Sequence, residues 1–275
     1  MVELGVMRFM SKDKLYIDDV MFSHAHSSSW YNHPTEFEWV RSDLSDYIVL
    51  SDHSIHKVDR YTNKKVYGWL LESPHITSHA YQFAKDNYEK FEKIFTFKKE
   101  LLELSDKFVS IPLGGCWLNE TERKIYDKSK MTSIIASPKR QTEGHRLRHD
   151  VIARFPIDAY GGGYQKVENK IESLKDYYFS VIIENCKEDY YFSEKLIDCF
   201  MSGTVPIYWG CPSIGDFFDV DGMIIFNDLN ELEQTLKSIT TGWYHQRKQA
   251  IENNFELAKK YLVAEDEIYK FLKNG

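Results

Sequence analysis

Short apolar runs alternate with amphipathic segments through the second half of the chain. Residues 179–183 form a short, mostly apolar run, which is typical of a buried parallel strand. A polar loop follows, and residues 193–203 then place Leu196, Ile197 and Phe200 on one helical face. The pattern predicts further strands at 133–136, 157–160, 205–208 and 223–226, and helices at 147–155, 169–176, 230–239 and 244–261. Such alternation indicates a doubly wound parallel sheet.

The first half shows the same types of element less regularly. Strands are predicted at 2–9, 47–51, 66–72, 94–97 and 108–112, and an amphipathic helix at 78–92. The polar stretch 119–130 carries charges of both signs and few core-forming residues, so it is the best candidate for a linker. We therefore expect an α/β protein with two Rossmann-like domains that face a cleft. The expected divisions are 1–125, 126–260 and a C-terminal helix over 261–275.

Composition narrows the class of protein. The chain has 275 residues, of which 43% are hydrophobic and 28% are charged, as in ordinary soluble globular proteins. A formal net charge of −7 argues against general affinity for nucleic acid or anionic membranes. No apolar run approaches the roughly 18–20 residues that span a bilayer, and the first residues do not resemble a signal peptide. The four cysteines lack C-x-x-C spacing, so we expect a reducing, cytoplasmic location, with peripheral membrane association left open.

Polar residues follow the apolar run at 179–183, where a strand would end. Glu184 and Asn185 come first, and Ser193 then stands where a helix N-cap is expected. In open α/β sheets, ligands bind at the carboxyl ends of such strands. The helix N-terminus favours an anionic group there, and Lys195 in the first turn adds a positive charge. The sequence thus predicts a phosphate site at this position.

This region resembles the donor-binding motif of the α1,3/4-fucosyltransferases, glycosyltransferase family 10. The matching residues are Glu184-Asn185, Tyr191-Phe192-Ser193-Glu194-Lys195 and Val205-Pro206-Ile207-Tyr208-Trp209-Gly210-Cys211-Pro212. The resemblance implies the GT-B fold, GDP-fucose as the donor, and inverting transfer to a glycan hydroxyl. It also implies that Asn185, Tyr191 and Glu194 contact the nucleotide sugar. Ile183, Phe192, Ser193 and Cys211 depart from the family pattern, in positions that could reshape the sugar pocket.

Sugar transfer from a nucleotide needs positive charge at the leaving diphosphate and a base for the acceptor hydroxyl. Lys195 and Arg146 are the predicted cations. Arg146 is chosen because related enzymes place an arginine at the same distance before a glycine run. Arg148 would point elsewhere on the helix, so Arg146 is preferred. Gly162 lies in that run, Gly161-Gly162-Gly163, which permits close backbone approach to a ligand. Glu72 begins Glu72-Ser73-Pro74, which resembles the family segment whose glutamate is the general base.

Two alternatives stay open for the function. One is a transferase of the same fold that uses another nucleotide sugar, and the other is a catalytically silent nucleotide-sugar-binding protein. No obligatory metal is expected, because Lys195 and Arg146 could supply the charge that Mg²⁺ supplies elsewhere. His24, His26 and His33 are interpreted as a polar loop rather than a metal site, and the neighbouring Trp30 and Tyr31 as possible contacts for the acceptor sugar.

Overall fold

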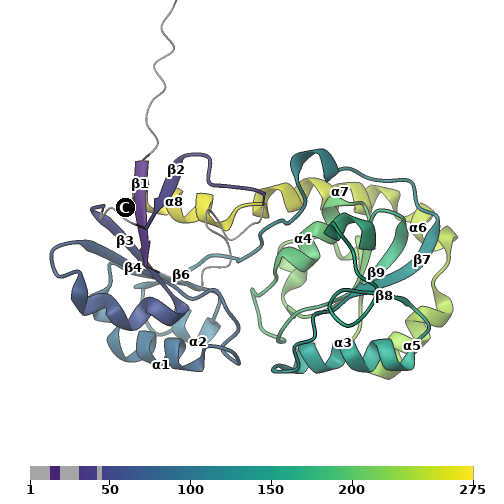
Figure 1. Cartoon of the computed structure of the whole chain (residues 1–275), viewed down its shortest axis with the longest axis horizontal. Coiled ribbons are helices and arrows are strands. Elements are labelled where there is room, and N and C mark those ends of the chain that lie inside the picture. The colour runs from purple at the N-terminus through teal and green to yellow at the C-terminus, as the bar shows by residue number, and fades with distance from the viewer. Residues whose placement is uncertain (1–12, 19–30, 42–44, 275) are drawn as a thin grey trace, which may run out of the picture.

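The computed structural model describes residues 13–18, 31–41 and 45–274. They form two α/β lobes that lie side by side, and the C-terminal helix runs back from the second lobe to the first (Figure 1). Each lobe is built on a sheet in which all the strands are parallel. This confirms the predicted two-domain α/β architecture.

The first lobe contains a six-stranded sheet with the order β2-β1-β3-β4-β5-β6. Its strands are β1 (Asp13–Asp18), β2 (Phe37–Val40), β3 (Tyr47–Ser51), β4 (Lys65–Trp69), β5 (Lys93–Thr96) and β6 (Phe108–Ser110). Successive side chains of a strand point to opposite faces, and β3 shows this well. Ile48 and Leu50 pack toward the 3₁₀ helix η1 (Asp52–Arg60) and α1 (Ser78–Asn87), whereas Val49 packs on the face that is covered by α8 (Ala264–Asn274).

The second lobe contains a five-stranded sheet with the order β11-β10-β9-β7-β8. Its strands are β7 (Lys130–Ile135), β8 (Asp158–Tyr160), β9 (Tyr177–Ile183), β10 (Val205–Trp209) and β11 (Ile224–Ile225). One face packs on α4 (Glu194–Met201) and the last turns of α7 (Lys248–Ala258). The other face packs on α3 (Glu143–Arg154), α5 (Leu229–Ser238) and α6 (Thr241–Gln246). Both faces of β9 and β10 are therefore buried, which explains why their sequences are almost entirely apolar.

The lobes are joined at two places. A connecting segment passes through the 3₁₀ turn η3 (Glu120–Glu122), which Asn119 caps, and the chain returns through η7 (Lys259–Tyr261) into α8. Ala264, Ile268 and Leu272 of α8 are buried against the first sheet. The helix predicted over 261–275 thus packs with the first lobe, although it follows the second lobe in sequence.

Several predicted elements differ from the structure. The predicted strand at 2–9 lies outside the described residues, and β1, β2 and η1 were not predicted. The predicted helix at 169–176 is only the 3₁₀ turn η4 (Lys170–Ser173), because the chain must enter β9 at Tyr177. The helix predicted at 244–261 starts earlier, as α6, and breaks at Arg247 before α7. The short α2 (Lys99–Leu102), which begins just after β5, was also missed.

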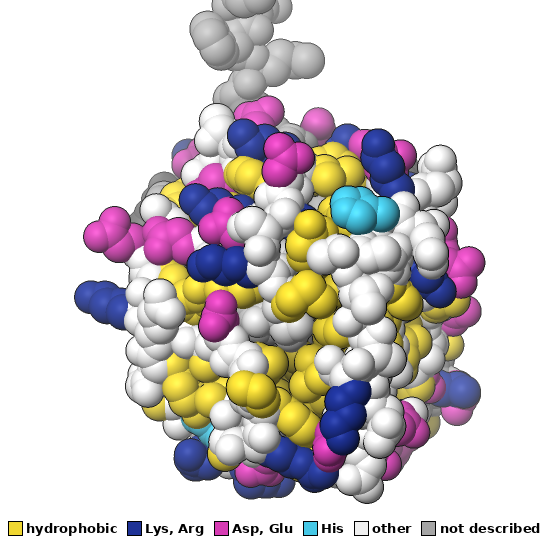
Figure 2. Space-filling model, turned by 90° about the vertical axis from the view of Figure 1, so that its right-hand side faces the viewer, with side chains coloured by type: hydrophobic (Ala, Val, Ile, Leu, Met, Phe, Trp, Pro, Cys, Tyr) yellow, Lys and Arg dark blue, Asp and Glu magenta, His cyan; other side chains and the backbone are white. Residues whose placement is uncertain are grey.

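The surface and the cysteines agree with an ordinary globular protein. Figure 2 shows the outer side of the second lobe, where acidic and basic side chains are interspersed around apolar ones. None of the helices in the described part of the chain is long and apolar enough to cross a membrane. All four cysteines are free, in line with the prediction that they form no disulfide framework, and all four are buried. The reducing compartment and the cytoplasmic location stay predictions.

Candidate functional site

Glu184 fixes the start of α4 at the carboxyl end of β9. Its carboxylate is fully buried and accepts hydrogen bonds from the Ser193 amide, at 2.9 Å, and from the Ser193 hydroxyl, at 2.6 Å. Ser193 is also the N-cap of α4, as the sequence predicts. The loop between β9 and α4 is thereby closed at its base, and the first turn of the helix is held at the end of the strand.

Lys195 lies in a compact group of charges at this helix terminus. Its Nζ is 2.9 Å from Ser193 Oγ, 3.2 Å from Glu194 Oε1 and 3.7 Å from Glu184 Oε2. Burial raises the pKa of Glu194, but the positive charges of Lys195 and Lys170 outweigh it and hold this pKa at about 2. Glu194 is therefore ionised at neutral pH. The Lys195 side chain is 20% exposed, so the group is not completely enclosed.

Lys170 is a cation that the sequence analysis missed. It comes from η4, and its Nζ lies 2.6 Å from Asp198 Oδ2 and 3.9 Å from Glu194 Oε1. The ammonium group also lies over the Trp117 ring, 5.1 Å from its centroid. Asp198 in turn accepts a hydrogen bond of 2.8 Å from the Trp117 amide, which belongs to the segment that joins the lobes. Lys170 and Asp198 thus tie this segment to α4.

The two arginines of α3 occupy different positions. Arg148 is buried, and its guanidinium donates to the Ile183 carbonyl at 2.5 and 2.9 Å and to Asn185 Oδ1 at 3.0 Å. Arg146 is exposed and donates to the carbonyls of Arg140 and Gln141. The side chain that faces the end of β9 is therefore Arg148, which the sequence analysis had placed second. The role predicted for Arg146 at the diphosphate stays a prediction.

Glycines allow close backbone contacts around this edge. A Cβ at Gly144, in the first turn of α3, would lie 1.7 Å from the Glu184 carbonyl oxygen. Gly161 has a φ of +105°, and a Cβ there would lie 2.2 Å from the Ala136 carbonyl oxygen. Gly162 is exposed beside Pro138. The glycine run thus brings the end of β8 against the end of β7, while a contact between Gly162 and a donor stays a prediction.

Asn185 and Tyr191 lie at opposite ends of the loop between β9 and α4. Asn185 is held by Arg148, and its carbonyl accepts a hydrogen bond from the Gly144 amide at 3.2 Å. Tyr191 is buried, and the centroid of its ring lies 4.6 Å from the ring centroid of Phe97 in the first lobe. Tyr191 therefore packs between the lobes in this structure. Its predicted contact with a nucleotide sugar stays a prediction.

Glu72 follows β4 on the first lobe, and the buried carboxylate of Asp52 supports its backbone. Asp52 accepts hydrogen bonds from the amides of Leu71, at 3.2 Å, and Glu72, at 3.1 Å. The Glu72 side chain is only half-buried. Burial raises the pKa of Tyr191 well above its usual value, and the negative charges of Glu184 and Glu72 add to this effect. Ser73, the next residue after Glu72, has a side-chain hydrogen bond with Cys186, so this part of the first lobe contacts the loop that leads to α4.

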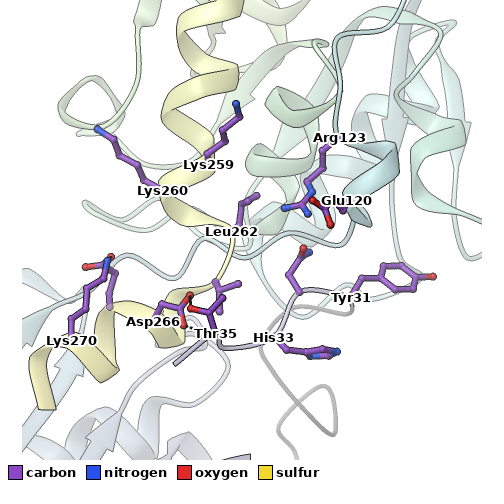
Figure 3. Close-up of a pocket in the computed structure, with 13 residues that line it drawn as sticks. Tyr31, His33, Thr35, Glu120, Arg123, Lys259, Lys260, Leu262, Asp266 and Lys270 are labelled. Atoms are coloured by element: carbon purple, nitrogen blue, oxygen red, sulfur yellow. Dashed lines mark hydrogen bonds and ion pairs between the residues drawn. The ribbon is translucent and has the colours of Figure 1, made fainter. Parts of the chain in front are cut away.

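No group of three or more His, Cys, Asp and Glu side chains that could hold a metal ion occurs in the described part of the chain. Asp219 and Asp221 form a turn in which the Asp219 side chain accepts a hydrogen bond from the Asp221 amide. A pocket of about 650 Å³ lies elsewhere, between residues 31–35, the connecting segment and the turn before α8 (Figure 3). His33 and Tyr31, the residue proposed from the sequence to contact the acceptor sugar, line it, whereas none of the predicted catalytic or donor-binding residues does.

Comparisons with known proteins agree with this geometry. Residues 125–268 match the family model described as "Glycosyltransferase family 10 (fucosyltransferase) C-term", which covers more than half of the chain. An α-(1,3)-fucosyltransferase of Helicobacter pylori is 35% identical over 88 residues, which are 32% of this chain and 18% of that protein. A fucosyltransferase-like protein of Arabidopsis thaliana is 33% identical over 85 residues, which are 30% of this chain and 17% of that protein. The matched part thus spans less than one fifth of either relative.

Solved structures establish the fold. A crystal structure of an α1,3-fucosyltransferase with GDP has a TM-score of 0.57 and 17% identity, and covers 97% of this chain and 96% of its own. Another, with GDP-fucose, has a TM-score of 0.56 and 16% identity, and covers 95% and 94%. The two lobes therefore have the GT-B fold. Together with the family model, these observations show that the chain belongs to glycosyltransferase family 10, the fucosyltransferase family.

Proposed function

We propose that this chain transfers L-fucose from GDP-fucose to a hydroxyl group of a glycan, with inversion at the sugar. The observation that carries the proposal is the pairing of a cationic helix terminus on one lobe with a strand-end glutamate on the other. Lys195 and the N-terminus of α4 form the first part, and Glu72 forms the second. The fold neighbours that were crystallised with GDP and GDP-fucose support the choice of donor.

The second lobe would hold the nucleotide. The N-terminus of α4 presents amide groups and a positive dipole end to a diphosphate, and Lys195 adds a charge-assisted hydrogen bond. Glu194 is ionised and can accept hydrogen bonds from the ribose or the sugar hydroxyls. Glu184 and Ser193 would keep this terminus in place while negative charge develops on the leaving group. A preorganised group of this kind stabilises the transition state more than the bound donor.

A second cation would come from α3. We propose Arg148 for this role, because its guanidinium lies at the carboxyl end of β9 beside Asn185. The negative charges of Glu184 and Glu194 also favour the charged form of Arg148, which supports this choice. Arg146 is the alternative, because it is exposed on the same helix and its guanidinium could turn toward a bound diphosphate. The two arginines can be separated by mutation.

The first lobe would supply the base. Inverting transfer needs one carboxylate that takes the proton of the acceptor hydroxyl on the side opposite the leaving group. The backbone of Glu72 is fixed by Asp52 and Tyr81, while its side chain stays half-exposed. That combination suits a base that must meet an incoming acceptor. The chain's own cations would replace a divalent metal at the diphosphate, so that no obligatory cofactor is required.

A panel of nucleotide sugars tests this function. The protein is incubated with GDP-fucose, GDP-mannose, UDP-galactose or UDP-N-acetylglucosamine and a mixture of acceptor oligosaccharides, with and without excess EDTA. Mass spectrometry should detect addition of a deoxyhexose from GDP-fucose alone, and EDTA should not abolish it. Transfer from a UDP-sugar would instead favour another nucleotide sugar. Binding of GDP-fucose without transfer or hydrolysis would favour a silent binding protein.

A further inference from the structure

The loop between β9 and α4 belongs to the second lobe in sequence but packs on the first. Cys186 and Tyr191 are part of the apolar cluster that contains Phe97 and Leu101 of the first lobe. Cys186 also has a side-chain hydrogen bond with Ser73, next to Glu72. The loop that starts at Glu184 and ends at the Ser193 cap is therefore shaped by contacts with the opposite lobe.

An ion pair between the lobes lies in the middle of this loop. Lys98 Nζ is 2.8 Å from Glu188 Oε1 and 2.9 Å from Glu188 Oε2. The two side chains are only 26% and 23% exposed. An exposed pair of this kind would contribute little, but partial burial and contact with both carboxylate oxygens make this interaction stronger than an ordinary surface pair.

The backbone at Tyr190, two residues after Glu188, has an unfavourable conformation that this ion pair helps to hold. Tyr190 has a φ of +61°, which is an unfavourable value for a residue with a bulky side chain. Its amide donates a hydrogen bond of 3.0 Å to Ser213 Oγ. Contacts on both sides of Tyr190 therefore have to stabilise the loop: the Glu188 ion pair before it and the Tyr191–Phe97 contact after it.

Lys98 is also linked to the candidate base. It follows β5, whose neighbour in the sheet is β4, and the amide of Leu70 donates to the Phe95 carbonyl at 2.9 Å. Glu72 and Lys98 thus follow the ends of two adjacent, hydrogen-bonded strands. The contact from Lys98 to the loop between β9 and α4, here called the donor-site loop, therefore connects the two lobes beside the strand end that carries Glu72.

We propose that Lys98 and Glu188 form a latch between the lobes that positions the donor-site loop and Glu72 for the reaction. This inference rests on the proposed function for its catalytic consequence, and on the structure alone for the latch. When the latch is broken, the loop loosens around Tyr190, and the base and the diphosphate site lose their fixed separation. Lys98 and Glu188 are positioning residues, because neither is placed to touch the reacting atoms.

Charge exchange tests the latch. We would compare the wild-type protein with Lys98→Glu, Glu188→Lys and the double variant that carries both changes. Lys99→Glu is the matched control, since Lys99 is the adjacent lysine and its ion pair is with Glu103, the residue that follows α2, at 3.8 Å. Hydrogen–deuterium exchange of residues 186–192 is measured without ligand, together with kcat/KM for GDP-fucose and thermal unfolding.

Each single variant should increase the exchange of these amides and lower kcat/KM by about tenfold, while the double variant recovers to within about threefold of wild type. Lys99→Glu should match the wild type in both measurements. A double variant no better than the worse single variant would overturn the latch, and so would unchanged exchange in the folded single variants. Recovery of exchange protection in a protein that does not use GDP-fucose would uphold the latch and refute the proposed function.

Discussion

Replacing Lys195 with alanine should weaken donor binding, slow transfer further and lower the stability of the fold. The substitution removes Nζ contacts to Ser193, Glu194 and Glu184. The pKa of Glu194 is about 2 in the folded protein instead of 4.5, and this difference corresponds to roughly 3 kcal/mol of favourable interaction with its surroundings. Lys170 supplies part of that interaction and remains in the variant. We therefore expect Lys195→Ala to cost about 1–3 kcal/mol of unfolding free energy.

The expected loss of GDP affinity is separate from the expected loss of stability. A charge-assisted contact with a phosphate is worth roughly 1.5–3 kcal/mol, which corresponds to an approximately 10- to 150-fold weaker affinity for GDP. The rate of transfer should fall further, because the contact strengthens as negative charge develops on the leaving diphosphate. Lys195→Arg keeps the charge and should retain more of both properties.

Calorimetric titration with GDP and initial rates of transfer measure these effects, at a temperature where thermal unfolding shows the variant to be folded. Lys187→Ala is the control, because Lys187 is an exposed lysine of the same loop whose Nζ contacts Asn227 Oδ1 at 2.6 Å. GDP affinity and transfer within about twofold of wild type in folded Lys195→Ala would refute the reasoning. Lys195 would then serve only to balance the acidic side chains around it.

Three further changes test the remaining parts of the site. Glu72→Gln should reduce transfer by about 10²–10⁴-fold and leave GDP affinity nearly unchanged, because the residue lies on the opposite lobe; near-normal turnover would show that another carboxylate is the base. Arg148→Lys should weaken GDP binding more than Arg146→Lys does, because Arg148 holds Asn185; the reverse order, measured by calorimetry, would assign the diphosphate to Arg146. Burial, together with the charge of Arg148, lowers the pKa of His145 from 6.5 to about 4. The unfolded chain therefore takes up a proton that the folded protein excludes, and stability falls as the pH decreases from 6.5 through 4. His145→Gln should make the urea midpoint less dependent on pH across this window, and an unchanged dependence would argue against a neutral, buried His145.

The central part of the second lobe could be predicted because its signals are local. Residues 179–183 and 205–208 are apolar on both faces, and Ser193 and Gly203 mark the limits of the helix between them. These local features predict the strand β9, the helix α4 and the position of Lys195 in the first turn of that helix. The strand β1 was missed because Asp13–Asp18 carries only two fully buried apolar side chains, Leu15 and Ile17. Such a short alternation is a weak signal in a single sequence.

The rest of the site depends on contacts between distant parts of the chain. Arg146 and Arg148 lie on different sides of α3, and only the packing of this helix on β9 shows which of them faces Asn185. Lys170 reaches Asp198 and Glu194 from a 3₁₀ turn, and no spacing in the sequence indicates that contact. The support that Asp52 gives to Glu72 likewise arises from two loops that meet at the ends of β3 and β4. Periodicity and motifs cannot reveal such pairings.

The proposed function requires the β9–α4 edge to bind the GDP part of the donor. The most direct measurement is calorimetric titration of the wild-type protein with GDP and with UDP, under the same conditions and in the presence of EDTA. GDP should bind with an affinity at least about tenfold higher than that of UDP, a difference of about 1.4 kcal/mol. Equal or tighter binding of UDP would contradict the proposed function.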